Sequence, residues 1–262
     1  MAACIKSAAA GVALLAMQLG VTCAPASSSP QSTVSRQSAA RVLQINHAPA
    51  TVVFAELSPP KPALDCAVRA CLALTFDDGP GEHTAALLDT LAAHQASATF
   101  FMLGSQAVKY PNVVRRVAHE GHEIGNHSWG HANFGPMQQV HIAADIAHAQ
   151  QSFKDLGVTP RLMRPPYGIH TPAVQQATEM SLAYWNIDPK DWDAKDPHAL
   201  AQAVIALAKP GGIVVMHDIK SVTVAAATEF VATLKQHYQL VTVSQLMGLS
   251  LQSPKADIFG RH

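Results

Sequence analysis

From Cys66 onward, short apolar runs alternate with amphipathic segments that are long enough to form helices. The apolar runs predict seven strands, at 72–76, 98–103, 123–125, 162–164, 181–186, 212–217 and 239–242. The segments between them predict helices at 83–94, 105–119, 138–156, 172–179, 198–208 and 222–237. Because parallel neighbours need helical crossovers, this order predicts an α/β domain with a parallel sheet. The spacing fits a barrel with one unit fewer than eight, and it also fits an open doubly wound sheet.

Composition and motif content disfavour several classes of partner. Lys plus Arg and Asp plus Glu both number 18, so the sequence has no basic footprint for nucleic acid or for an anionic membrane. Neither a Gly-x-Gly-x-x-Gly fingerprint nor a Gly-Lys-Ser/Thr sequence follows a predicted strand, which disfavours a nucleotide cofactor. The 14 histidines favour a metal or acid–base site without locating it.

The first residues predict export. Lys6 precedes an apolar run at 8–21, which is short for a bilayer crossing because that takes about 20 apolar residues. A small-x-small cleavage pattern stands at 24–26, so we expect a signal peptide at 1–26 and no transmembrane span in the mature protein. Cys23 leaves a lipoprotein anchor open as the weaker alternative, since the residues before it match the lipidation pattern poorly.

The composition changes again after the signal peptide. Residues 27–65 are rich in Ser, Gln, Ala and Pro, which predicts a largely disordered linker with at most a short strand at 51–57. A single catalytic domain is expected at 66–250, followed by a C-terminal tail at 251–262.

Two cysteines stand just before the first predicted strand. Cys66 and Cys71 have the spacing C-x4-C, which in an exported protein predicts a short-loop disulfide at the entrance to the domain. A two-cysteine metal site is the weaker alternative, because no Cys or His partners stand nearby in the sequence.

The first strand ends abruptly at two adjacent carboxylates. Asp77 and Asp78 follow the apolar run at 72–76 and precede Gly79-Pro80. Neighbouring side chains of a regular strand point to opposite faces, so both carboxylates can serve one site only where this turn bends the chain. Active sites of α/β folds lie at the C-terminal ends of strands. A plain polar turn is the alternative interpretation.

Two histidines follow the third strand with a spacing of four residues. On a helical turn this spacing would place the imidazoles of His127 and His131 on one face. With one carboxylate from Asp77 or Asp78 they would form a set of three ligands with an open position, which is typical of catalytic zinc. A pair of histidines at this spacing is by itself more often part of a surface or a core.

The next helix carries a similar pattern that we interpret differently. His141, Asp145 and His148 share a helical face, but no strand end or turn motif stands beside them. We therefore expect them to form a solvated helix face.

Three further strand ends carry groups that are suited to chemistry. Arg164 precedes a proline-stiffened turn, where it can pair with a carboxylate. Asp188 and Trp192 supply a carboxylate and an aromatic wall of the kind that sugars stack against, and His217 ends the strand at 212–217. Each of these segments could also be an ordinary polar loop that ends a strand and has no catalytic role. Five such endings in one alternating domain make coincidence a poor explanation.

These endings together resemble the five motifs of the polysaccharide deacetylases, carbohydrate esterase family 4. The matching segments are Thr75-Phe76-Asp77-Asp78-Gly79-Pro80, His127-Ser128-Trp129-Gly130-His131, Arg164-Pro165-Pro166-Tyr167, Asp188-Pro189-Lys190-Asp191-Trp192 and Met216-His217. The resemblance covers about Cys66 to Met247, and it implies a distorted (β/α)7 barrel that resembles a TIM barrel.

The resemblance also implies a metal site and a general base. By position, Asp78, His127 and His131 would be the ligands of a divalent metal, most often Zn²⁺, with Co²⁺ as an alternative. Asp77 would be the general base, and Arg164 would hold it in place.

The remaining roles concern the acid and the substrate. By the same resemblance, His217 would be the general acid and Asp191 would orient it. The backbone N–H of Tyr167 would help to bind the oxyanion, and Trp192 and Met216 would line the acetyl pocket.

The activity implied is hydrolysis of N-acetyl groups on N-acetylglucosamine units of peptidoglycan, chitin or chitooligosaccharides, through a metal-activated water. The alternatives are an O-acetyl esterase acting on xylan and an inactive glycan-binding domain that kept the fold. We expect an exported monomer whose partner is the acetylated glycan.

Overall fold

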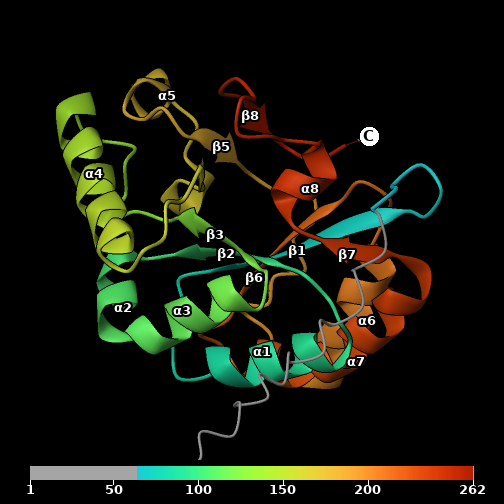
Figure 1. The fold of residues 1–262 in the computed structure, drawn as a ribbon. Helices are drawn as coiled ribbons and strands as arrows, with labels where there is room; N and C mark the ends of the chain where they lie inside the picture. Colours follow the sequence, from blue (N-terminus) through green and yellow to red (C-terminus); the bar gives the residue numbers. More distant parts are fainter. Residues whose placement is uncertain (1–63, 262) are drawn as a thin grey trace, which may run out of the picture. The chain divides into compact units, whose positions relative to one another are not determined.

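Strands and helices alternate along the part of the chain that the computed structural model describes, residues 64–261 (Figure 1). The strands are β1 (Cys71–Asp77), β2 (Thr99–Met102), β3 (Glu123–Asn126), β4 (Leu162–Met163), β5 (Ser181–Ala183), β6 (Ile213–His217), β7 (Gln239–Val241) and β8 (Asp257–Ile258). The helices are α1 (Thr84–Ala93), α2 (Gly104–Lys109), α3 (Pro111–His119), α4 (Gln139–Asp155), α5 (Pro172–Gln176), α6 (Pro197–Leu207), α7 (Ser221–His237) and α8 (Val243–Met247), with a 3₁₀ turn at Pro166–Gly168.

The predictions for the N-terminal residues lie outside the described part of the chain. They comprise the signal peptide at 1–26, the anchor at Cys23 and the linker up to residue 63. Within residues 64–261, no helix has the length and apolar character that a bilayer crossing requires.

All paired strands run parallel, in the order β6-β1-β2-β3-β4-β5-β8. β7 pairs with the first half of β1, on the side where β2 pairs with its second half. After β5 the chain returns to β6 through a bridge between Ile187 and Val214, which curls the sheet toward closure. The predicted parallel α/β barrel is confirmed, as a curled and partly closed one.

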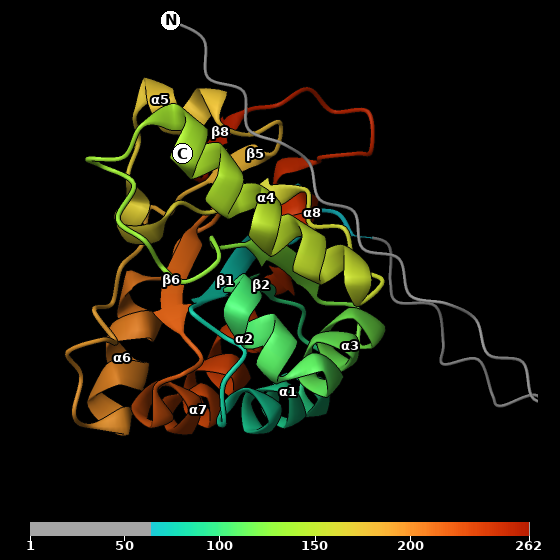
Figure 2. The same ribbon diagram turned by 90° about the vertical axis from the view of Figure 1, so that its left-hand side faces the viewer.

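β1 is the central strand of the fold, and every one of its residues is buried. Leu72, Leu74 and Phe76 pack with residues of α1 and α7 in the main hydrophobic core. Figures 1 and 2 both show these two helices side by side along one face of the sheet. Alternation along the strand turns Asp77 to the opposite side, where it meets Arg164. The strand therefore anchors the core on one face and presents a carboxylate on the other.

One predicted helix is two helices in the structure. The single helix expected at 105–119 is wrong, because α2 ends at Lys109 and α3 begins at Pro111. Proline lacks the N–H that would continue the first helix, but it suits the first turn of a new one.

The C-terminal part of the chain holds elements that the sequence did not indicate. α8 has only five residues and is stabilised by a capping box between Thr242 and Gln245. β8 lies in the predicted tail at 251–262 and pairs with β5, so the described residues form eight strands and not seven. Both elements are too short to give a periodic pattern.

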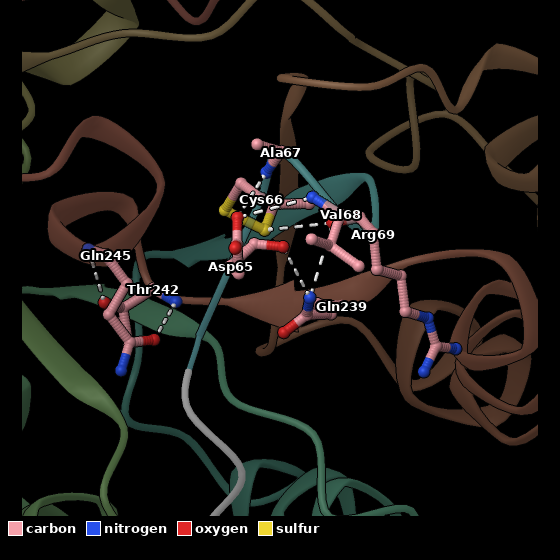
Figure 3. The surroundings of a disulfide bond; sticks show 9 residues. Asp65, Cys66, Ala67, Val68, Arg69, Gln239, Thr242 and Gln245 are labelled. Atoms are coloured by element: carbon pink, nitrogen blue, oxygen red, sulfur yellow. Dashed lines mark hydrogen bonds between the residues drawn. A yellow bond between two sulfur atoms is a disulfide. The ribbon is translucent and has the colours of Figure 1, made fainter.

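The predicted disulfide between Cys66 and Cys71 is confirmed. Figure 3 shows it next to the side chain of Gln239, whose Nε2 donates to the backbone oxygens of Asp65 at 3.0 Å and Arg69 at 3.4 Å. These contacts tie the entrance of the domain to the start of β7.

Candidate active site

A bend after β1 brings two neighbouring carboxylates into one cavity. Asp77 ends the strand and is buried, and Asp78 follows with a φ of 73°, in the left-handed region. This conformation turns the chain out of the strand, so both side chains line a cavity of about 380 Å³. Gly79 is needed at the bend, because a Cβ there would lie 2.3 Å from both carboxylate oxygens of Asp218. The predicted bend is confirmed.

Two imidazoles face the second of these carboxylates. Nε2 of His127 lies 3.4 Å from Oδ1 of Asp78, and Nε2 of His131 lies 3.3 Å from the same oxygen. The prediction that these two histidines lie on a helical turn is wrong. Residues 127–131 form a non-helical turn in which Ser128 and His131 have φ values of 75° and 63°. Two left-handed residues curl the chain back on itself, and this brings the imidazoles together.

The residues present fit a divalent metal. The candidate ligand atoms of Asp78, His127 and His131 all lie within 4.8 Å of one another. Oδ1 of Asp78 is buried and has no hydrogen-bond partner among residues 64–261, which is costly unless a cation satisfies it. Nδ1 of His127 lies 2.6 Å from the backbone oxygen of Arg164, so Nδ1 carries the proton and Nε2 presents its lone pair. Burial lowers the pKa of His131, which also favours the neutral imidazole that a metal requires.

A fully buried guanidinium holds the first carboxylate. Nη1 of Arg164 donates to Oδ1 of Asp77 and to Oγ1 of Thr75, both at 2.7 Å. Nε and Nη2 donate to the backbone oxygens of Ala183 and Tyr184, at 3.0 and 2.9 Å. Because these bonds satisfy the buried charge, Arg164 fixes one oxygen of Asp77. The other oxygen, Oδ2, faces the candidate metal ligands and lies 4.0 Å from Nε2 of His127.

A second carboxylate–imidazole pair stands at the end of β6. Nδ1 of His217 lies 2.8 Å from Oδ1 of Asp191. Oδ2 of Asp191 accepts from the backbone N–H of His217 and from the hydroxyl of Thr223, both at 2.7 Å. Burial opposes a charge on His217, but the hydrogen bond and charge of Asp191, with smaller contributions from Asp77 and Asp78, outweigh it. They raise the pKa of His217 to about 9.

Aromatic rings form the walls of the cavity. Trp192 is 55% exposed and Tyr167 is 66% exposed, and both line the cavity. Trp185 lines it as well, although the sequence placed this residue inside a strand at 181–186. Because β5 ends at Ala183, Trp185 belongs to the segment beyond the strand end. The position of this aromatic residue near the predicted C-terminal end of the strand could have indicated that it lines the site.

Met216 does not line the cavity, which corrects the sequence prediction. Its side chain is fully buried in the main hydrophobic core, whereas Val215 and His217 line the cavity. Side chains alternate along β6, so the residues on either side of Met216 face the site and Met216 faces the helices.

The helix face expected to be solvated makes contacts that the sequence did not indicate. Oδ1 of Asp145 accepts the backbone N–H of Trp129 at 2.8 Å. The ring of His148 stacks on the indole of Trp129, with centroids 3.7 Å apart. His141 and His148 are both exposed and Asp145 is half-buried, so the face is solvent-exposed as predicted, but two of its three residues also contact the turn at 127–131. The contacts were not predictable locally, because the turn and α4 meet only in the folded domain.

Comparison with known proteins places the chain among named deacetylases by similarity. The family model described as polysaccharide deacetylase matches residues 65–185. The peptidoglycan-N-acetylglucosamine deacetylase PgdA of Listeria monocytogenes is 38% identical over 187 residues, which cover 70% of this chain and 40% of that protein. This chain therefore spans less than half the length of that relative.

Two further matches cover most of the compared protein. A peptidoglycan-N-acetylglucosamine deacetylase of Bacillus cereus is 37% identical over 186 residues, covering 67% of this chain and 87% of the relative. A solved structure of T48 deacetylase with substrate is 39% identical, with a TM-score of 0.70, and the match covers 74% of this chain and 99% of that one. With this identity over most of a relative's length and with the same fold, the chain belongs to the polysaccharide deacetylase family.

Proposed function

We propose that this protein is an exported, metal-dependent hydrolase that removes N-acetyl groups from N-acetylglucosamine units of a glycan such as peptidoglycan, chitin or a chitooligosaccharide. One observation carries the proposal. A single cavity joins the Asp78, His127 and His131 cluster to a carboxylate held by arginine and to an imidazole held by a carboxylate. These are the groups that hydrolysis of an unactivated amide needs.

Asp78, His127 and His131 would hold the metal, with Zn²⁺ as the first candidate because of its preference for nitrogen and carboxylate ligands. Bound there, a divalent cation would polarise the amide carbonyl and make a nearby water more acidic.

Asp77 is proposed as the general base. Arg164 binds Oδ1 of Asp77 and holds the carboxylate in place, while Oδ2 faces the candidate metal ligands, 4.0 Å from Nε2 of His127. The free oxygen can then accept a proton from the attacking water. Arg164 acts through Asp77 and does not need to touch the substrate.

His217 is proposed as the general acid. A pKa of about 9 keeps its imidazole charged at neutral pH, so it can protonate the leaving amine. β1 and β6 pair in the register Asp77 with His217, which places the acid and the base on adjacent strands. Asp191 orients the imidazole and maintains its charge.

The cavity walls account for the binding of an acetylated sugar. The backbone N–H of Tyr167 is proposed as an oxyanion donor, and a donor of this kind is typically worth about 3 kcal/mol. Trp192 and Trp185 offer aromatic surface for the sugar ring and the acetyl group. Val215 takes the pocket position that the sequence had assigned to Met216.

Export is proposed on two grounds. A disulfide closes the entrance of the domain, and disulfides persist in oxidising compartments. The relatives named above deacetylate peptidoglycan, a cell-wall polymer.

The direct test is acetate release from peptidoglycan, chitin oligomers and acetylated xylan by the same preparation. We expect release from at least one N-acetylated glycan, loss of this activity after chelation, and recovery with Zn²⁺ or Co²⁺. Release from xylan alone would favour the O-acetyl esterase. Glycan binding without any acetate release, in protein replete with metal, would favour an inactive binding domain.

A further inference from the structure

We propose that Asp145, supported by His148, is a positioning residue for the metal site. The two side chains would hold the turn at 127–131 in the shape that brings His131 to Asp78. The inference deepens the proposed function, since it rests on the metal site assigned there. Neither residue touches the candidate ligand atoms, so both would act through the backbone and the indole of Trp129.

Two local hydrogen bonds stabilise the turn at 127–131. The backbone N–H of Ser128 donates to Oδ1 of Asn126 at 2.8 Å, and the N–H of His131 donates to Oγ of Ser128 at 2.9 Å. Ser128 and His131 are both in the left-handed region, which L-residues with a Cβ adopt at a cost. A turn of this shape persists only where its surroundings hold it.

Three further hydrogen bonds join Ser128 and Trp129 to neighbouring elements. The backbone oxygens of Ser128 and Trp129 accept from the N–H groups of Gly104 and Ser105 at the start of α2, both at 3.0 Å. The third bond joins the N–H of Trp129 to Oδ1 of Asp145 on α4. This third bond has a carboxylate as its acceptor, whereas the other two have backbone carbonyls. Hydrogen bonds to a charged acceptor are roughly twice as strong as neutral ones.

The indole of Trp129 forms a second link to α4. The ring of His148 lies against it with an interplanar angle of 13°, three residues after Asp145 on the same helix. Gly104 lies close to the same indole, because a Cβ there would lie 2.8 Å from Cε3 of Trp129. The turn is therefore held between α2 and α4 on both its backbone and its largest side chain.

The three candidate metal ligands lie on two separate segments of the chain, so their spacing depends on how those segments are held. Asp78 is attached to β1, whereas His127 and His131 enter and leave the turn. His127 is anchored separately, through Nδ1 and the backbone oxygen of Arg164. The side chain of His131 is 27% exposed, and its ring makes a T-shaped contact with the ring of Tyr167. Its distance from Asp78 therefore depends mainly on the shape of the turn.

The experiment measures metal affinity in the full chain after the metal has been removed. Zn²⁺ dissociation constants are determined by competition with a chelator, and Co²⁺ absorption spectra report the ligand geometry. The variants are Asp145→Ala, Asp145→Asn and His148→Ala. Asp155→Ala is the matched control, because Asp155 is exposed on the same helix and its carboxylate accepts from Gln151, four residues earlier on that helix. Urea unfolding of each apo-protein accompanies the titrations.

Asp145→Ala is expected to weaken Zn²⁺ binding about tenfold, at the lower end of the effect of groups that orient metal ligands. Asp145→Asn keeps an acceptor oxygen and should stay within about threefold of wild type, and Asp155→Ala should not differ from it. The Co²⁺ spectrum should change in Asp145→Ala alone among these three. If Asp145→Ala does not fold, His148→Ala carries the test, with an expected loss of about threefold.

Unchanged affinity in both Asp145→Ala and His148→Ala, or an equal loss in Asp155→Ala, would overturn the inference. Its failure is separable from failure of the proposed function. Wild-type protein that binds Zn²⁺ or Co²⁺ but releases no acetate contradicts only the function. Wild-type protein that binds neither ion contradicts both.

Discussion

The charge of His217 should depend on Asp191, and Asp191→Asn tests this directly. The carboxylate makes two hydrogen bonds to His217, and the pKa of His217 rises from its ordinary 6.5 to about 9. The difference between a pKa of 6.5 and one of about 9 corresponds to about 3 kcal/mol in favour of the charged imidazole. Asparagine keeps an acceptor oxygen but removes the charge, so the pKa should return toward 6.5. A bound cation would lower both pKa values and move the pH at which the two rates diverge downward, so the separation between the two proteins is the predicted quantity.

The expected result is a shift of the alkaline limb of kcat toward lower pH. At pH 8 a group with a pKa of 9 is about 90% protonated, whereas one with a pKa of 6.5 is about 3% protonated, so the variant should be about 30-fold slower. At pH 5.5 His217 is mostly protonated in both the wild type and the variant, and the two rates should agree within about threefold. Initial rates of acetate release from a chitooligosaccharide, measured from pH 5 to 10, provide the comparison.

Thr223→Val is the matched control, because it removes one hydrogen bond from Asp191 and leaves the charge in place. Its alkaline limb should stay close to that of the wild type. If Asp191→Asn lowers kcat by the same factor at every pH, Asp191 acts by position alone and the electrostatic reasoning is wrong.

The same shift has a consequence for stability. A histidine whose pKa is raised by folding contributes stability that is fully present below its unfolded value, near pH 6.5, and is lost as the pH rises through about 9. The apo-protein should therefore lose up to about 3 kcal/mol of unfolding free energy across this range, and Asp191→Asn should lose less. Urea unfolding at several pH values measures this. Parallel curves for the two proteins would contradict it.

Three further substitutions test separate parts of the reasoning. Asp77→Ala should lower kcat by about 10² to 10⁴ while Zn²⁺ stays bound, as measured by acetate release and metal analysis; undiminished turnover would refute its role as the base. Replacing Cys66 and Cys71 together by serine should lower the unfolding free energy by about 2 kcal/mol in urea, and an unchanged midpoint would show that the short loop contributes nothing. Met216→Ala should destabilise the domain by about 2 to 5 kcal/mol with little change in KM, whereas Val215→Ala should change KM with a smaller loss of stability; the reverse pattern would restore Met216 to the pocket.

Several parts of the site were predictable because their signals are local. Asp77, Asp78 and His217 follow apolar runs, and the C-terminal ends of parallel strands meet at one edge of a sheet. The disulfide between Cys66 and Cys71 was predictable for the same reason, since its partners stand five positions apart. The β8 strand was not, because two residues carry no pattern and their pairing with β5 depends on the folded sheet.

The alternating apolar runs of this sequence determined a parallel α/β fold and the strand ends at which its polar groups would gather. The tertiary structure decided which side chains face one another there. It placed Val215 and not Met216 in the cavity, because the face of a strand residue depends on which side the helices cover. It brought His131 to Asp78 through a left-handed turn, and it set Asp145 of α4 against that turn. Contacts between segments that are distant in sequence exist only once the chain has folded, so no local pattern encodes them.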